Sequence, residues 1–147
     1  MNNQTEKFWN EYCEKHGVDP SEAVDVFSFG TAADELADLV KEGKKTATCS
    51  AYVEYEWEEE PLPEKGERSI VLDASNEPAA VIEVTDVVIM PMNEVPEAFA
   101  LAEGEGDYQD WWNAHETFFT ELLESYGSAF RKDMLVVCER FNVVYGG

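Results

Sequence analysis

The stretch Gly43–Ser50, which reads Gly-Lys-Lys-Thr-Ala-Thr-Cys-Ser, marks the change from helix to strand in this chain. A helical apolar stripe ends at Gly43, and strict alternation begins at Thr46. Side chains alternate between the two faces of a strand, so Thr46, Thr48 and Ser50 share one face. The stretch predicts a row of hydroxyl groups next to two lysines. Such a row forms either a small polar ligand site or an ordinary solvated edge.

The residues before this stretch predict two helices with a short extended piece between them. Residues 4–16 carry aromatic side chains at helical spacing, and Gly17 is typical of a helix end. Residues 24–29 read as a short strand. Thr31 then predicts an N-cap, with Asp34 at the capping-box position of the helix that closes at Gly43.

The residues after it predict three strands. Apolar and polar side chains alternate from 46 to 57, which indicates one continuous strand. An acidic, proline-containing loop follows at residues 58–66. Residues 69–73 and 79–90 are rich in Val and Ile, and this near-continuous apolar content favours burial on both faces.

The C-terminal third predicts two helices and a last strand. Asn93 is placed to cap a short helix with Pro96 in its first turn. The loop at 103–107, Glu-Gly-Glu-Gly-Asp, leads into a longer helix capped by Asp107, and residues 134–145 form the final strand. This order of elements predicts an α+β domain with a mostly antiparallel, barrel-like sheet.

The composition limits the classes of partner. The chain has 147 residues, with 32 acidic against 10 basic side chains and a formal charge of -22. Such a charge opposes binding to extended duplex nucleic acid or to an anionic membrane. The N-terminus shows no signal pattern, and no apolar run is long enough to span a bilayer. We therefore expect a cytoplasmic protein.

Cysteine and histidine are too few for the common metal and disulfide frameworks. Cys13, Cys49 and Cys138 are odd in number and widely spaced, so we interpret them as small buried hydrophobes. There are only two histidines, which excludes a multi-histidine metal site within one chain. His115 falls on the apolar stripe of its helix, which favours a buried, hydrogen-bonded side chain over a catalytic one.

Several side chains could carry chemistry, each with a structural alternative. Lys45 could act as a base or hold a phosphate, or it could complement the C-terminus of a helix, as we prefer for Lys44. Thr48 could be a nucleophile if a base lies within reach, or an ordinary strand threonine. The acidic loop at 103–107 could supply a general acid or base, bind a cation, or be a solvated turn.

A group of short motifs resembles the ASCH domain family, in particular its bacterial branch. The motifs are Phe29-Gly30, the helix at 34–40, Gly43–Thr48, Pro61-Leu62-Pro63, the loop at 103–107, Trp112, His115 and the strand at 137–141. The resemblance covers residues 27–145. It implies a PUA-like fold, a small mixed or antiparallel β-barrel flanked by helices, with a cleft where the Gly-x-Lys loop meets the barrel. We expect one domain over 1–147, with a helical extension at 1–24 and the barrel core at 25–147.

The resemblance also implies an activity. Some small bacterial members are associated with hydrolysis of the acetyl amide of N4-acetylcytidine through a Lys, a Thr three residues later and a distant Glu. Here these are Lys45, Thr48 and Glu105, with Glu103 as the alternative carboxylate. Lys45 would take the proton of Thr48, and Glu105 would bind or protonate the leaving amine. The expected substrate contacts are Phe29, Lys44, Ser50, Glu103, Asp107, Trp112, His115 and Arg131. For this activity we expect no metal and no cofactor.

Two other functions fit the same resemblance. One is a module that binds a modified nucleoside or short single-stranded RNA without chemistry, and the other is a metal-dependent ribonuclease. The strong negative charge favours a small neutral nucleoside over an RNA polymer as the partner. The sequence leaves the oligomeric state open.

Overall fold

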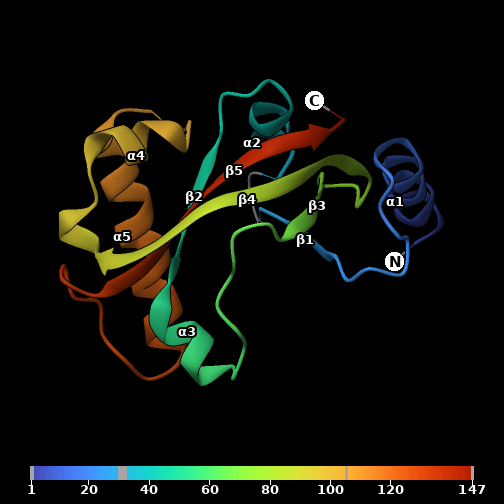
Figure 1. Cartoon of the computed structure of the whole chain (residues 1–147). Helices are drawn as coiled ribbons and strands as arrows, with labels where there is room; N and C mark the ends of the chain where they lie inside the picture. Colours follow the sequence, from blue (N-terminus) through green and yellow to red (C-terminus); the bar gives the residue numbers. More distant parts are fainter. Residues whose placement is uncertain (1, 30–32, 105, 147) are drawn as a thin grey trace.

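A computed structural model describes residues 2–29, 33–104 and 106–146 (Figure 1). In these residues a five-stranded sheet has the strand order β1-β3-β4-β5-β2. Only β1 and β3 are parallel among its paired strands; the other pairs are antiparallel. The strands are β1 (Asp25–Ser28), β2 (Ala47–Ala51), β3 (Arg68–Leu72), β4 (Pro78–Pro91) and β5 (Leu135–Tyr145). The sheet curls into a half-barrel, which confirms the predicted α+β, PUA-like class.

The helices pack at different places on this sheet (Figure 1). They are α1 (Asn3–His16), α2 (Ala33–Lys41), α3 (Tyr52–Trp57), α4 (Glu97–Ala102) and α5 (Tyr108–Ser125), with a 3-10 turn η2 (Met92–Glu94). Helix α1 lies at one end of the sheet, and α4 and α5 lie at the other. Register shifts in the β3–β4 and β4–β5 pairs add local twist, which helps the sheet to curl.

Three groups of buried side chains hold these layers together. Helix α1 packs through Trp9 and Cys13 on Ile70 and Val81. Helix α2 packs on Val71, Ala80 and Phe141, among others. The third group joins α4 and α5 to the face of the sheet formed by Ala47, Cys49, Ala51, Val136 and Cys138. This last group surrounds the polar site described below.

Several predicted helix ends are confirmed. Gly17 has φ 65° and accepts the left-handed conformation that closes α1. Asp107 caps α5, and its side chain and that of Asp110 form a capping box. The cap predicted at Thr31 lies outside the described residues. No helix in the described ranges is long and apolar enough to cross a membrane.

The prediction of one strand over residues 46–57 is wrong in its second half. Strand β2 ends at Ala51, and Tyr52–Trp57 forms the helix α3. The reason lies in the partner strand. Ala51 pairs with Val136, and β5 begins at Leu135, so a longer β2 would have had no ladder to join. Alternation within one segment does not reveal where its partner ends.

Two smaller predictions also fail. Asn93 does not cap a helix that runs through Pro96, because Val95 precedes a proline and is extended, and α4 begins only at Glu97. Strand β4 is buried on both faces only in its first half. Beyond Asp86, the adjacent residues Val88 and Ile89, which point to opposite faces, are 41% and 40% exposed, so neither face of that part of β4 is fully covered.

Candidate functional site

Lys45 is enclosed by the protein although it carries a charge. The residue is 1% exposed, and its Nζ donates to the carbonyl oxygen of Ala47 at 3.0 Å. It also donates to the carbonyl oxygen of Glu103 and to Oε1 of the same residue, both at 3.3 Å. The ring centroid of Phe29 lies 5.2 Å from Nζ, within cation–π range. A buried ammonium needs such compensation, because loss of water costs several kcal/mol.

The strand register explains why Lys45 reaches this place. Phe141 N donates to Thr46 O, so this opposed pair is hydrogen-bonded and the next one, Ala47 with Arg140, is not. In a non-hydrogen-bonded pair the backbone groups point away from the partner strand. Since β2 is an edge strand, the carbonyl of Ala47 points to its free edge. The Lys45 ammonium therefore lies beside the free edge of β2.

Glu103 is the buried partner of Lys45. It is 1% exposed and follows the last turn of α4, where α4 packs against β2. Its Oε1 lies 3.3 Å from Lys45 Nζ, while Oε2 accepts a hydrogen bond from Trp111 Nε1. Nε2 of His115 also lies 3.3 Å from Oε2. The carboxylate is thus held on both oxygens by three side chains from two segments, the residues before β2 and helix α5.

His115 is buried and hydrogen-bonded, as predicted. It is 9% exposed, its ring stacks on that of Trp111, and Nδ1 lies 2.8 Å from the carbonyl oxygen of Trp111. Both ring nitrogens therefore lie close to oxygen atoms. Lys45 and His115 contact different oxygens of the Glu103 carboxylate. The hydrogen bond from Trp111 to Glu103 was not predicted from the sequence.

Thr48 lies on the other face of β2 from Cys49. Ala47, Cys49 and Ala51 are buried towards α4 and α5, while Thr48 and Ser50 are half-buried on the opposite face. Thr48 is paired with Glu139 of β5. The structure thus brings Lys45 and Glu103 together, and it places the Thr48 hydroxyl with a different set of neighbours. The predicted carboxylate Glu105 lies outside the described residues.

Two residues next to Ser50 and Thr48 were missed by sequence reasoning. Tyr55 Oη lies 2.9 Å from Ser50 Oγ. Glu139 is half-buried. Its carboxyl has a pKa raised to about 7, mainly by burial and then by the negative charges of Glu67 and Asp25. One signal for Glu139 was present in the sequence, since it is a charged residue directly after the apolar run Leu135–Cys138.

The same cluster has a donor set for a metal ion. One ligand atom each of Cys49, Glu103 and His115 lie within 4.8 Å of one another, and all three residues are buried. Two features oppose a cation there. A hydrogen bond with Cys138 and burial both raise the pKa of the Cys49 thiol, so it stays protonated. In addition, the Lys45 ammonium already pairs with the Glu103 carboxylate, and its positive charge would repel a cation at the same place. The arrangement suits an ion pair better than a metal centre.

The other expected substrate contacts have roles elsewhere. Lys44 is exposed and pairs with Glu42 at 3.1 Å. Arg131 is exposed and pairs with Asp133 through two hydrogen bonds. The indole nitrogen of Trp112 donates to Glu116 at 2.8 Å, along its own helix, and Asp107 caps α5. The prediction of substrate contacts from these four side chains stays untested.

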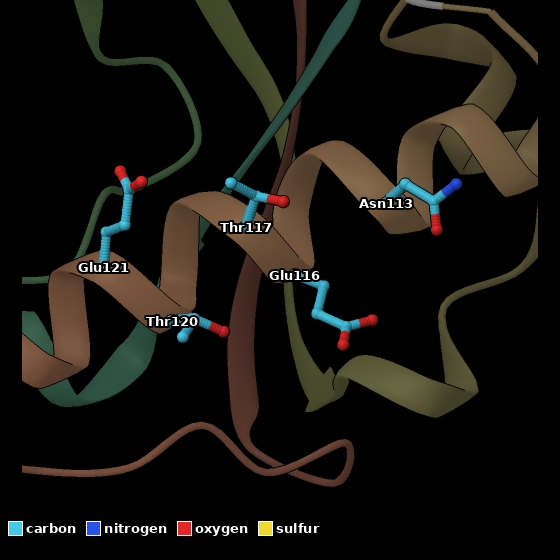
Figure 2. Close-up of a pocket in the computed structure, with 5 residues that line it drawn as sticks. All are labelled: Asn113, Glu116, Thr117, Thr120 and Glu121. Carbon is cyan, nitrogen blue, oxygen red and sulfur yellow. The ribbon is translucent and has the colours of Figure 1, made fainter.

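Two surface hollows lie away from Lys45. One, of about 410 Å³, is lined by polar side chains of the outer face of α5 (Figure 2): Asn113, Glu116, Thr117, Thr120 and Glu121. The other, of about 280 Å³, lies between α3, the end of α5 and the start of β5, and Arg131 is part of its lining. Neither lining includes Lys45 or Glu103. Both hollows are open, and the first is formed by a single helix.

A comparison with protein-family models finds one match. The model of the ASCH domain matches residues 25–145, which is nearly the whole length. The chain belongs to the ASCH domain family. Helix α1 lies outside this match. The comparison with curated proteins found no match.

Two solved structures share the fold over almost the full length, and a more distant one shares it over about four fifths of this chain. Protein EF3133 from Enterococcus faecalis V583 is 43% identical, with a TM-score of 0.91 over 98% of this chain and 90% of that one. An ASCH domain from Lactobacillus crispatus JV V101 is 32% identical, with a TM-score of 0.93 over 99% and 96%. An ASCH protein from Zymomonas mobilis is 12% identical with a TM-score of 0.51, over 81% of this chain and 65% of that one, and shows the fold alone.

Proposed function

We propose that this ASCH domain hydrolyses the acyl amide of a modified pyrimidine nucleoside such as N4-acetylcytidine. The observation that carries the proposal is the buried pair of Lys45 and Glu103 at the free edge of β2. Buried charged pairs are costly, and a stable core does not need them. Groups of this kind are often retained because a reaction uses them.

The resemblance to the hydrolases supplies the roles. It gives a Lys, a Thr three residues later and a Glu, which are Lys45 and Thr48 with Glu103 in the place of the carboxylate. Water is consumed, the bond between the acyl carbon and N4 breaks, and a carboxylic acid and the free amino group form. Thr48 Oγ1 attacks the acyl carbon and passes its proton to the Lys45–Glu103 pair, which gives a proton to N4 as the bond between N4 and the acyl carbon breaks. Water then hydrolyses the resulting Thr48 ester, which releases the carboxylic acid and restores the hydroxyl. A small neutral nucleoside also suits a protein of charge -22.

The test is turnover of N4-acetylcytidine, measured as cytidine released. We expect Lys45→Ala, Glu103→Gln and Thr48→Ala each to lower kcat/KM by roughly 100-fold or more, the size typical of lost acid–base or nucleophilic groups. Lys41→Ala is the matched control, because Lys41 is a nearby, exposed lysine in the last turn of α2 and should keep full activity.

Removal of one member of a buried pair can also damage the fold. Thermal unfolding of each variant is therefore measured beside the kinetics, and Thr48→Ser tests the hydroxyl with little structural change. The proposal fails if the folded protein releases no cytidine, or if folded Lys45→Ala and Thr48→Ala variants turn over as fast as the unmodified protein.

A second candidate is a binding module without chemistry. Lys45 Nζ has three acceptors at 3.0–3.3 Å within the protein, which is also what a purely structural ammonium would have. This function predicts saturable binding of the nucleoside without release of product. Calorimetry and chromatography on the same samples separate the two functions. For either function we propose the reducing cytoplasm as the compartment, which suits three free cysteines.

A further inference from the structure

The face of the sheet opposite Cys49 carries polar side chains that the proposed reaction uses only in part. We call this set the hydroxyl face; it consists of Thr48, Ser50, Tyr55 and Glu139. The hydroxyls of Ser50 and Tyr55 are hydrogen-bonded to each other at 2.9 Å, which fixes Tyr55 of α3 over this face. Thr48, Ser50 and Glu139 are half-buried, so a ligand can reach them.

The strand register places Glu139 next to Thr48. The pair formed by Thr46 and Phe141 is hydrogen-bonded, and two residues further along the same holds for Thr48 and Glu139. Opposed residues of an antiparallel pair project from the same face, with Cα atoms about 5.5 Å apart in a hydrogen-bonded pair. The Glu139 side chain therefore projects from the same face as Thr48, directly opposite it in the ladder.

The charges around Glu139 are negative. Glu67, just before β3, and Asp25 on β1 both add to the rise in the pKa of Glu139, after burial, to about 7. The charge of Glu139 also affects the pKa of Tyr55 on α3. Its pKa is raised mainly by burial, lowered by the bond to Ser50, and raised again by Glu139. Near neutral pH, Glu139 is thus present both as a carboxylic acid and as a carboxylate.

A carboxylic acid offers a different surface from a carboxylate. It has an O–H donor beside a C=O acceptor, in one plane, whereas the ionised form only accepts. A cytosine ring presents the complementary edge, with the N–H of its exocyclic nitrogen beside the lone pair of the ring nitrogen N3. The two edges match when the carboxyl is protonated.

We propose that Glu139, which projects beside Thr48 from the hydroxyl face, is the residue that recognises the base, with its carboxyl group paired to the edge formed by N3 and the exocyclic N–H. The identity of the base as a cytosine rests on the proposed function. The role of Glu139 is inferred from its pairing with Thr48 in the ladder of β2 and β5, and from the acidic groups Glu67 and Asp25 near it. The ligand class is a neutral nucleoside with a donor and an acceptor side by side, and a phosphate group would be repelled by Glu67 and Asp25.

Binding of cytidine, measured by calorimetry at pH 6 and pH 8, tests this role. In the unmodified protein we expect Kd to rise about tenfold between these pH values, because the O–H donor is lost. Glu139→Gln keeps a donor and an acceptor, so it should bind cytidine with equal Kd at both pH values. Glu139→Ala should bind at least tenfold more weakly at pH 6. Glu121→Gln, on the exposed face of α5, is the control and should behave as the unmodified protein.

A second ligand checks the contact to the ring nitrogen. 3-Deazacytidine keeps the amino group and lacks N3, so its Kd should not rise with pH. The proposal is overturned if cytidine does not bind at either pH, if its Kd is the same at both, or if Glu139→Ala binds as tightly as the unmodified protein. Hydrolysis assays on the same variants separate the two claims. Binding that depends on Glu139 without turnover contradicts the proposed reaction alone, and turnover unaffected by Glu139→Ala contradicts this inference alone.

Discussion

At the scale of single residues, the charged groups inside this domain differ in how they are compensated. Glu103 is buried with Lys45, Trp111 and His115 on its two oxygens. Glu139 is half-buried beside other carboxylates, and its pKa rises to about 7 from an ordinary value of 4.5. A buried carboxylate without a cation costs free energy once it ionises. The charge of Glu103 is therefore compensated by its partners, whereas ionisation of Glu139 lowers the stability of the folded protein.

Glu139→Gln should therefore stabilise the protein at high pH. The folded protein holds the Glu139 proton up to pH of about 7, while the unfolded chain releases it near 4.5. Stability from this group is full below pH 4.5, falls as the pH rises to about 7 and is then constant. At pH 8 the loss amounts to about 3 kcal/mol, since each pH unit in this window costs ~1.4 kcal/mol.

Urea unfolding of the Glu139→Gln variant and of the unmodified protein at pH 5 and pH 8 measures this effect. The variant should gain about 2 kcal/mol more at pH 8 than at pH 5. Glu121→Gln, an exposed change of the same type, should show no such difference. An equal gain at both pH values would mean that the Glu139 carboxyl is not shielded from water.

At the scale of the elements, the helix α3 forms where β2 runs out of a partner strand. β5 begins at Leu135, so the chain after Ala51 leaves the sheet and turns into Tyr52–Trp57. This short helix has no fully buried side chain. Trp57 stacks on Tyr126 just after α5 with ring centroids 4.5 Å apart, and Tyr55 bonds to Ser50. These two contacts fix the position of α3 over the hydroxyl face.

Trp57→Ala should loosen α3 without unfolding the domain. Loss of the stacked ring costs about 1 kcal/mol, which lowers Tm by about 3 °C for a domain of this size. Trp57→Phe keeps a ring that can stack on Tyr126 and should recover most of the loss. Differential scanning calorimetry of the three proteins measures this. Equal Tm values for the Ala and Phe variants would show that the stack does not hold α3.

At the scale of the whole molecule, the charge of -22 dominates long-range interactions. Surface carboxylates repel each other, and this repulsion destabilises the compact state. Dissolved salt screens it over about 8–10 Å at physiological ionic strength. The same field opposes the approach of nucleic-acid polymers, which is why a small neutral nucleoside is the ligand that we propose.

Salt should therefore stabilise the protein. We expect Tm to rise by a few degrees between 10 mM and 200 mM NaCl at pH 7.5, because the screening length falls severalfold. Scanning calorimetry at constant pH measures the change, with a protein of similar size and near-zero net charge as the control. A Tm that falls with added salt would mean that attractive ion pairs outweigh the repulsion among the carboxylates.

The sequence by itself determined what depends on neighbouring residues in the chain. The caps at Gly17 and Asp107, the two faces of β2 and the burial of His115 follow from local spacing and side-chain chemistry, and the α+β class follows from the order of elements. The motifs of the ASCH domain family added the fold. Thr46–Ser50 alternates as predicted, but the alternation continues to Trp57 where the strand does not, since the ladder of β5 ends.

Only the tertiary structure decided which distant residues meet. Lys45 and Glu103 are 58 positions apart, and they pair because the end of α4 packs on the free edge of β2. Glu139 comes to lie opposite Thr48 through the register of β2 and β5, which a single sequence does not specify. The burial and the charged neighbours of these side chains come from packing between distant segments. The interaction free energy of such contacts is absent from the isolated segments, so local sequence patterns do not reveal it.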